Sequence, residues 1–285
     1  MAKLAVFVLF KNVIHFGDRP FLSPKLVRDQ CKNFIRSFQY VLGVVHPHRS
    51  NFSVELNRTL ISDRHFNDIK NLEKYATKHI NWYSRGQKDQ VHPYFNYLLL
   101  DPRITNELRQ RCVRMHMLDV WYTFLRAIFY IGKGKAARPY VHLRQALQLF
   151  QKERPNLTLD YAGRVRLARD PKLALILDIW RQQRGVLLLR GFRNIGSDDA
   201  HTREAAMIDA LGMNHLTNRR QGAYFGVVRR EFTIVQRKLL GIILLYKLFK
   251  LFMNKKRERE LHPEHFIKSR SKYQHAHMSL PLANA

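Results

Sequence analysis

Short apolar runs bounded by turn residues occur three times in the middle of the chain, and each predicts a strand. The first covers residues 94–100 and stops at the turn-forming pair Asp101-Pro102. Residues 127–132 and 186–192 form the other two runs. A nearly continuous apolar run of this length is typical of a strand that other elements cover on both faces.

Helical spacing predicts helices between and around these strands. A helix over residues 139–151 carries apolar side chains at i, i+3, i+4 and i+7, namely Leu143, Ala146, Leu147 and Phe150. One face of this helix is therefore expected to be buried. The other predicted helices cover residues 28–45, 66–80, 105–126, 171–183, 200–211 and 233–253. Asp198 and Asp199 are suitable N-caps for the helix that begins at residue 200.

Strands that alternate with helices predict an α/β sandwich of about 140 residues, an ordinary size for a domain. We expect residues 91–230 to form this domain. Residues 1–90 are expected to form a partly helical accessory region, whose function the sequence does not indicate. Residues 231–285 are expected to form an apolar and basic helix followed by a polar tail.

The chain carries a large positive charge. Its 285 residues include 50 Lys and Arg against 22 Asp and Glu, which gives a formal net charge of +28. The basic residues are spread along the sequence, so we expect a basic surface on a folded domain. Such a charge repels itself unless an anionic partner lies nearby, and nucleic acid is the commonest such partner. An anionic membrane is the second candidate.

Several other classes of protein are disfavoured. Cys31 and Cys112 are too few and too far apart to indicate a disulfide scaffold or a cysteine zinc site, so we expect a reducing intracellular compartment. The apolar run 4–10 is cut by Lys11 and has no evident cleavage site, which argues against a signal peptide. No stretch reaches the ~20 apolar residues of a membrane span. We expect residues 239–246 to lie in a packed helix, with an interfacial membrane helix as the alternative.

The candidate chemistry is concentrated in residues 129–143. An apolar strand breaks at two glycines, and a helix begins near Pro139. Arg138 and His142 are four residues apart, so we expect them one turn apart on the face opposite the buried one. With Tyr130 and Lys133 they bring a phenol, an ammonium, a guanidinium and an imidazole close together. That combination suits a site that handles phosphate.

These residues resemble the motifs of the GIY-YIG nuclease family. Tyr130-Ile131-Gly132 is the second family triplet, and Phe95-Asn96-Tyr97 stands in place of the first, keeping its tyrosine and losing its glycine. Other matches are Lys133, Arg138 at the helix start, His142 one turn later as in some members, Glu204 at the family's metal-binding glutamate, and Asn218 at the family's asparagine.

Longer stretches look like the metazoan nucleases that carry ankyrin repeats and a LEM domain. They cover residues 97–103, 129–134, 138–143 and 259–263. This resemblance implies a small GIY-YIG-type sandwich, with a three-stranded, mainly antiparallel sheet flanked by helices. Two departures stand out. Residues 103–125 form a long insertion where the family usually has a short hairpin, and we find no ankyrin-type repeat or convincing LEM domain in the first 90 residues.

The resemblance implies a metal-dependent DNA endonuclease. Tyr97 or Tyr130 would be the general base. A phenol has an ordinary pKa of about 10, so Lys133 and Arg138 are expected to lower that value. Arg138 would also stabilise charge on the scissile phosphate. His142 would orient the tyrosine or assist the leaving group.

Glu204 would hold one divalent metal ion, Mg²⁺ or Mn²⁺. Its neighbours one helical turn away include no Lys or Arg. A carboxylate on such an apolar face needs a partner, and a hydrated metal ion qualifies. The alternative is a surface carboxylate in a salt bridge. Asn218 would fix the nearby loop by hydrogen bonds, although an ordinary turn asparagine fits the same context.

DNA is the expected partner, including branched or otherwise non-B-form DNA, with no small-molecule cofactor and no membrane association. The residues expected to contact its backbone are Lys135, Arg154, Arg164, Arg166, Arg169, Arg219 and Arg220. Backbone contacts carry little sequence information, so we expect structure-guided or weakly sequence-specific cleavage. The alternatives are a catalytically weakened nucleic-acid-binding module and a basic membrane-surface protein. We expect a nuclear location, a cytoplasmic one or both.

Overall fold

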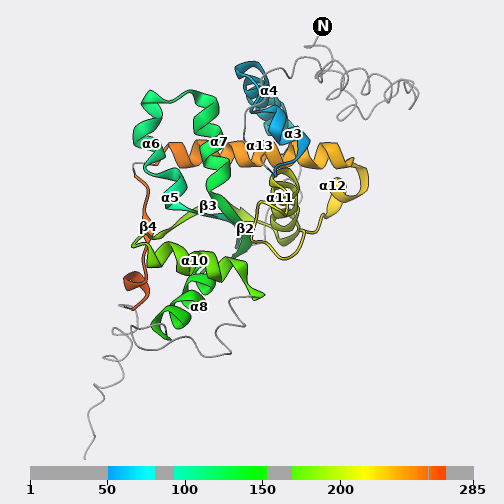
Figure 1. Cartoon of the computed structure of the whole chain (residues 1–285). Helices are drawn as coiled ribbons and strands as arrows, with labels where there is room; N and C mark the ends of the chain where they lie inside the picture. Colours follow the sequence, from blue (N-terminus) through cyan, green and yellow to red (C-terminus); the bar gives the residue numbers. More distant parts are fainter. Residues whose placement is uncertain (1–50, 81–92, 153–168, 256, 268–285) are drawn as a thin grey trace, which may run out of the picture. The chain divides into compact units, whose positions relative to one another are not determined.

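The computed structural model describes residues 51–80, 93–152, 169–255 and 257–267, which belong to one compact unit (Figure 1). The elements in chain order are α3 (Val54–Arg58), α4 (Asp63–Ile80), β1 (Tyr94–Leu100), α5 (Pro102–Thr105), α6 (Leu108–Arg111), the 3₁₀ turn η1 (Cys112–Arg114), α7 (Met117–Ala127), β2 (Ile128–Lys135), α8 (Arg138–Lys152), α10 (Pro171–Arg181), β3 (Val186–Ile195), α11 (Ser197–Leu211), α12 (Gly226–Glu231), α13 (Ile234–Met253) and β4 (Glu260–Leu261).

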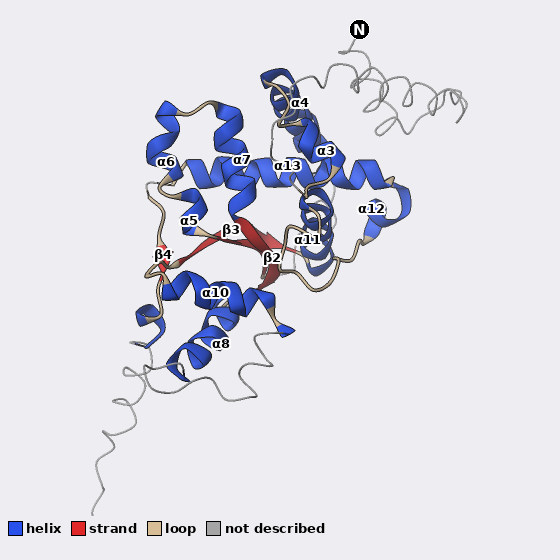
Figure 2. Cartoon of the chain, viewed as in Figure 1, coloured by secondary structure: helices blue, strands red, loops and turns tan. Residues whose placement is uncertain are grey.

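The strands form one antiparallel sheet in the order β2-β1-β3-β4, so β2 lies at an edge. The predicted α/β class and the three predicted strands are confirmed. The fourth strand, β4, has two residues, which is too short for any periodicity to reveal it. Helices cover both faces of the sheet (Figure 2).

Side chains of β1 alternate between the two faces, as the pleat of a strand requires. Leu98 and Leu100 join an apolar core with α7, α11 and α13. Tyr97 and Leu99 join a second core with α8 and α10. Both cores are closed to solvent, which explains why β1 is apolar along nearly its whole length.

The glycines of β2 do not end the strand, contrary to the prediction. β2 continues through Gly132 and Gly134 to Lys135, and the chain turns at Ala136, whose φ is 41°. Each glycine makes room for a side chain instead. A Cβ atom on Gly132 would lie 2.6 Å from the Tyr97 hydroxyl, and one on Gly134 would lie 2.5 Å from Cβ of Arg138.

The single helix predicted over residues 105–126 is wrong. Asn106 and Glu107 adopt positive φ values of 41° and 55°, which stop α5 and set a new direction for α6. Helical spacing alone cannot reveal such a break, because neither residue is glycine or proline. The segment therefore folds as three short helices and one 3₁₀ turn.

The start of α11 also differs from the prediction. The N-cap is Gly196, which makes no side-chain cap, and Asp198 and Asp199 lie within the first turn. Their charges still suit the positive end of the helix dipole. Asp199 accepts a hydrogen bond of 2.7 Å from Nε of Arg203, one turn along the helix.

The predicted packed helix near the C-terminus is confirmed as α13. Its residues from Gly241 onward are largely buried, mainly against α11. A Cβ atom on Gly241 would clash with the carbonyl oxygen of Ala206, so the glycine permits the close crossing of the two helices. No helix within the described ranges is both long and apolar enough to cross a membrane.

The helix predicted over residues 66–80 is confirmed as α4, with Phe66 and Ile69 buried. Both α3 and α4 pack on α13. The helix predicted over residues 28–45 lies outside the described residues, as do residues 153–168 of the basic loop that the sequence predicts over residues 152–170. The domain boundaries at residues 90 and 230 stay predictions.

Candidate active site at the edge of the sheet

Two tyrosines on neighbouring strands meet at the β2 edge. Tyr97 faces Gly132 across the β1–β2 pair, and Tyr130 lies two residues earlier on β2. Their ring centroids are 6.0 Å apart, and the two hydroxyls share a hydrogen bond. Because Gly132 has no side chain, the Tyr97 ring can extend across β2 towards the outer edge of the sheet. The Tyr97 side chain is almost fully buried, whereas Tyr130 is partly exposed.

Burial raises the pKa of both phenols, so the lowering expected from nearby cations is not the net result. For Tyr97, burial is the largest cause, and its hydrogen bond to Tyr130 raises the pKa further. For Tyr130, burial and the charge of Glu204 raise the pKa, while the hydrogen bond from Tyr97 and the charge of Arg138 lower it. The shared hydrogen bond therefore favours ionisation of Tyr130 over that of Tyr97.

Glu204 has a protein partner that the sequence does not reveal. Nζ of Lys133 on β2 lies 2.6 Å from Oε2 of Glu204 on α11, although the two residues are 71 positions apart. Both side chains are mostly buried, at 22% and 11% exposure. Burial raises the pKa of Glu204, and Lys133 opposes that rise. The pair brings together groups from α11 and from the edge strand.

Two further cations, Arg138 and Lys172, lie near the tyrosines. Arg138 at the start of α8 is exposed, and its stem packs on Gly134. Lys172, in the first turn of α10, is only 9% exposed, and its Nζ lies 4.6 Å from the centroid of the Tyr130 ring. Its ion pair with Asp170 is long, at 3.9 Å. Burial lowers the pKa of Lys172, and Arg138 and Arg219 lower it further, while Asp170 opposes them.

Sequence reasoning missed Lys172. Nothing in the apolar helix that follows Pro171 marks this lysine as different from a surface charge. Its proximity to Tyr130 comes only from the packing of α10 against α8 and the sheet.

His142 does not lie on the exposed face of α8, contrary to the prediction. It is 7% exposed, and its ring packs edge-on against Tyr130 with centroids 5.2 Å apart. Among the described residues, neither ring nitrogen has a hydrogen-bond partner at an ordinary distance and angle. Burial lowers the pKa of His142 to about 4, with Lys172 and Arg138 contributing. The imidazole is therefore neutral at physiological pH.

This burial predicts an acid sensitivity that can be measured. An unfolded histidine has a pKa of about 6.5. Below that value the unfolded chain takes up a proton that the folded protein does not, so stability falls as the pH drops towards 4. The gap between 6.5 and about 4 corresponds to about 3 kcal/mol of lost stability at pH 4. We expect His142→Phe to lose that much less stability than wild type between pH 7 and pH 4.

Urea unfolding of both proteins at several pH values checks this expectation. Three partly buried histidines, His65, His201 and His215, also have lowered pKa values, but they are present in both proteins and cancel in the comparison. Equal pH dependence in wild type and variant would contradict the assignment.

Asn218 ties the loop after α11 to the edge strand. Its Oδ1 accepts from the Ile131 N–H at 3.0 Å, and its Nδ2 donates to the Ile131 carbonyl at 2.8 Å. Thr217 donates to the Phe129 carbonyl through both its N–H and its hydroxyl. These bonds pair the open edge of β2 and hold the loop beside Tyr130, consistent with the predicted loop-fixing role.

The sequence comparisons agree with this geometry. Residues 94–268, more than half of the chain, match the model of the LEM-3-like GIY-YIG domain. The chain belongs to this family. No solved structure matches the chain.

Relatives of this GIY-YIG domain lie within much longer proteins. It is 40% identical over 183 residues to ankyrin repeat and LEM domain-containing protein 1 of Homo sapiens, covering 63% of this chain and 28% of that protein. The Mus musculus protein is 39% identical over 170 residues, covering 60% and 29%. The Caenorhabditis elegans homolog is 30% identical over 135 residues, covering 47% and 17%. The chain thus spans less than a third of the length of these relatives.

Membership of this family indicates the general type of activity but not the role of each residue. A GIY-YIG domain of this type is a nuclease-type domain, which implies a nucleic-acid substrate. The resemblance identified from the sequence is therefore confirmed. The roles predicted for individual residues stay predictions.

GIY-YIG nucleases generally use divalent metal ions, and the chemistry of Glu204 fits one. Its carboxylate supplies hard oxygen ligands, and a nearby cation would offset the burial that raises its pKa. Mg²⁺ is commonly held by one or two carboxylates, with water and substrate phosphates at the remaining positions. No cluster of three or more His, Cys, Asp or Glu occurs in the part of the chain that the structure describes.

The structure brings some of the predicted DNA contacts near this GIY-YIG site. Lys135 ends β2, with its Nζ 4.6 Å from the centroid of the Tyr94 ring, and Arg219 lies close enough to lower the pKa of Lys172. Arg169 and Arg220 are exposed. The remaining predicted contacts, Arg154, Arg164 and Arg166, lie outside the described residues.

Two residues beside the site were not predicted from the sequence. The Tyr94 hydroxyl bonds Ser197 at the start of α11, and this bond, followed by the charge of Lys135, lowers the Tyr94 pKa. Asn96 donates to the Ala200 carbonyl at 2.9 Å and faces Lys133 across the strands. The position of Asn96 in the altered first triplet hinted at a special role, since an amide is unusual in a buried strand.

Proposed function

We propose that this domain is a metal-dependent DNA endonuclease that hydrolyses phosphodiester bonds. One observation carries the proposal. Two hydrogen-bonded phenols, a buried carboxylate–ammonium pair and an exposed guanidinium converge at one strand edge, which Gly132 and Gly134 leave open for them. An activated water, stabilisation of charge on the phosphate and a tolerable leaving oxygen are what such hydrolysis requires.

Tyr130 is our choice for the general base. It accepts the hydrogen bond from Tyr97, and this bond favours its phenolate form. The cations of Arg138 and Lys172 lie nearby and favour the same form. Tyr97 is more deeply buried and serves as the donor that positions Tyr130. His142 packs on the Tyr130 ring and keeps its orientation.

Arg138 is suited to bind the scissile phosphate. Its guanidinium is exposed at the start of α8, where free backbone N–H groups also favour an anion. A guanidinium can donate two parallel hydrogen bonds to phosphate oxygens, which adds orientation to charge. Lys172 and Arg219 extend the same positive surface.

Glu204 would hold the divalent ion, Mg²⁺ or Mn²⁺. When bound, such an ion would stabilise negative charge on the phosphate and the leaving 3′-oxygen. Lys133 neutralises Glu204 in the free protein and places an ammonium beside the site. Asn218 holds the loop that closes the β2 edge.

The proposed substrate is DNA that the protein recognises through its backbone. Lys135, Arg169, Arg219 and Arg220 are exposed and basic, and contacts of this type read shape more than sequence. Branched or otherwise distorted DNA is therefore a candidate substrate alongside linear duplex.

Cleavage assays with and without a divalent ion test the proposal. The full chain would be incubated with linear and branched DNA in magnesium, in manganese and in excess chelator. We expect cuts with either ion and a loss of at least about 10³-fold in rate with chelator, because charge on the phosphate is then uncompensated. Full activity in chelator would contradict metal dependence.

The second candidate is a nucleic-acid-binding module with weakened catalysis. The raised pKa values of both tyrosines and the altered first triplet favour it. DNA binding without cleavage of any substrate, in either ion, would support this module over the endonuclease.

A further inference from the structure

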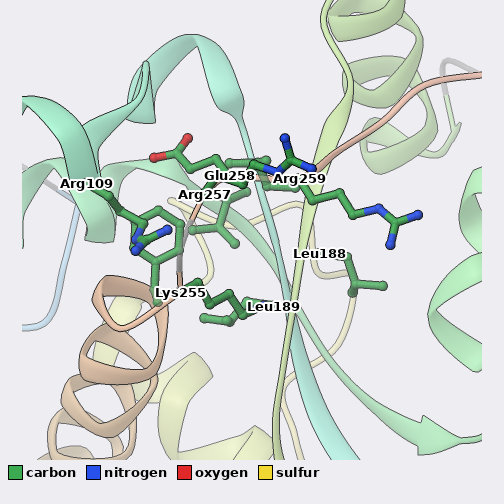
Figure 3. Close-up of a pocket in the computed structure, with 10 residues that line it drawn as sticks. Arg109, Leu188, Leu189, Lys255, Arg257, Glu258 and Arg259 are labelled. Carbon is green, nitrogen blue, oxygen red and sulfur yellow. The ribbon is translucent and has the colours of Figure 1, made fainter.

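A basic pocket lies beside Leu100, the last residue of β1. Figure 3 shows the residues that line it. Its volume is about 50 Å³, and its floor consists of Leu187–Leu189 on β3 and Phe252 of α13. Its rim consists of Arg109 on α6 and of Lys255, Arg257, Glu258 and Arg259 in the segment after α13. We call this the rim pocket. Four cations and one carboxylate line it, so its net charge is strongly positive.

Arginines and glutamates alternate in residues 257–260, which follow α13, and the glutamates hold this segment in place. Glu258 accepts a hydrogen bond of 2.6 Å from the Thr105 hydroxyl, and Glu260 pairs with Arg184 at 2.8 Å. The intervening arginines, Arg257 and Arg259, are exposed. Figure 3 shows the Glu258 carboxylate turned away from Leu189. The acidic residues anchor the segment, and the basic ones are left free to bind.

The positive charge of the pocket is incompletely compensated within the described residues. Arg109 donates from Nε to the Met253 carbonyl at 3.1 Å, but its Nη1 is buried without a partner. Lys255 is exposed as a residue, but partial desolvation of its ammonium lowers its pKa, and the charges of Arg193 and Arg109 lower it further. A buried donor without a partner calls for a bound ion or water. An anion would satisfy Nη1 and relieve the repulsion among the cations.

The volume of the pocket indicates the size of the anion that it can hold. One water needs about 10–15 Å³ of such space, so 50 Å³ suits a group of about four oxygen-sized atoms. Guanidinium groups match the oxygens of a phosphate in pairs. Leu100 at the pocket lies three residues after Tyr97, so the two residues are about 10 Å apart along β1.

We propose that the rim pocket binds a backbone phosphate of a nucleic-acid strand, outside the position where cleavage occurs. The choice of nucleic acid rests on the proposed function; the preference for a phosphate rests on the pocket itself. The pocket would thereby fix the direction in which the substrate leaves the active site.

Salt-dependent DNA binding tests the rim pocket without relying on cleavage. The double variant Lys255→Gln/Arg257→Gln removes two rim cations, and Arg229→Gln/Arg230→Gln on α12 removes the same charge from an exposed site elsewhere. Affinity of the full chain for a duplex without terminal phosphates would be measured in chelator over a range of salt concentrations. We expect the rim variant to bind about 10-fold more weakly, with the slope of log K against log salt reduced by about 1.

Three outcomes would overturn the proposal. Equal losses in both double variants would show that only net charge matters. Wild-type affinity in the rim variant would show that DNA does not reach the pocket. Thermal stabilisation of wild type by inorganic phosphate, lost in the rim variant without any change in DNA binding, would assign the pocket to a free anion. Failure of the proposed function is distinct, because wild type would then bind DNA and cut none.

Discussion

Glu204→Gln is expected to lower the rate of DNA cleavage by at least about 10³-fold while leaving the fold and DNA binding nearly unchanged. The amide keeps the shape of the side chain and an oxygen that can accept from Lys133. It removes the negative charge that a hydrated divalent ion requires. The loss should therefore appear in kcat rather than in the affinity for DNA.

Asp199→Asn on the same helix is the matched control for this variant. Asp199 lies in the first turn of α11 and pairs with Arg203, so its replacement also removes one acidic charge from α11. We expect near wild-type cleavage from the control. Cleavage by Glu204→Gln at the control rate would refute the metal-holding role, and a shared loss in both variants would indicate damage to α11 instead.

Tyr130→Phe is expected to lower the cleavage rate by about 10²–10⁴-fold, the usual contribution of a general base. Tyr97→Phe should cost less, about 10-fold, because it removes only the hydrogen bond that favours the Tyr130 phenolate. Tyr94→Phe is the control, since the Tyr94 hydroxyl bonds Ser197 instead. Single-turnover cleavage at saturating protein separates these effects from binding.

The pH dependence of the same assay adds an independent readout. The pKa of Tyr130 is raised above 10, so its phenolate fraction grows with pH throughout the range in which the protein is stable. We expect the wild-type rate to rise about tenfold per pH unit between pH 6 and 9, and the Tyr130→Phe rate to lose that slope. Loss of the slope in Tyr97→Phe but not in Tyr130→Phe would reverse the assignment of the base.

Much of the fold was predictable because it rests on local patterns. The first strand was predicted with its observed bounds, and the buried face of α8 follows from the spacing of Leu143, Ala146 and Leu147. The predicted helix over residues 105–126 failed because positive φ values at Asn106 and Glu107 leave no mark in the spacing. β4 was not predicted because a strand of two residues is too short to show a periodic pattern.

The residues of the candidate site could be named from the sequence, but their arrangement could be predicted only in part. Tyr97, Tyr130, Lys133, Arg138, His142, Glu204 and Asn218 were identified through the family motifs, and the structure places them around one strand edge. Glu204 was expected to have a metal ion as its partner, with a salt bridge as the alternative. The lysine that pairs with it lies 71 residues away, where a search along one helix cannot find it. His142 was expected on an exposed face, yet α8 turns it onto Tyr130.

The sequence by itself determined the alternation of strands and helices, the basic character of the chain and its resemblance to GIY-YIG nucleases. Each of these depends on residue types and on spacings within one element, which the sequence displays directly. Only the tertiary structure showed that the two glycines of β2 make room for other side chains, that Lys133 pairs with Glu204, and that Lys172 is buried beside Tyr130. Those features depend on which elements pack together, and contacts between distant segments leave no periodic trace in the chain.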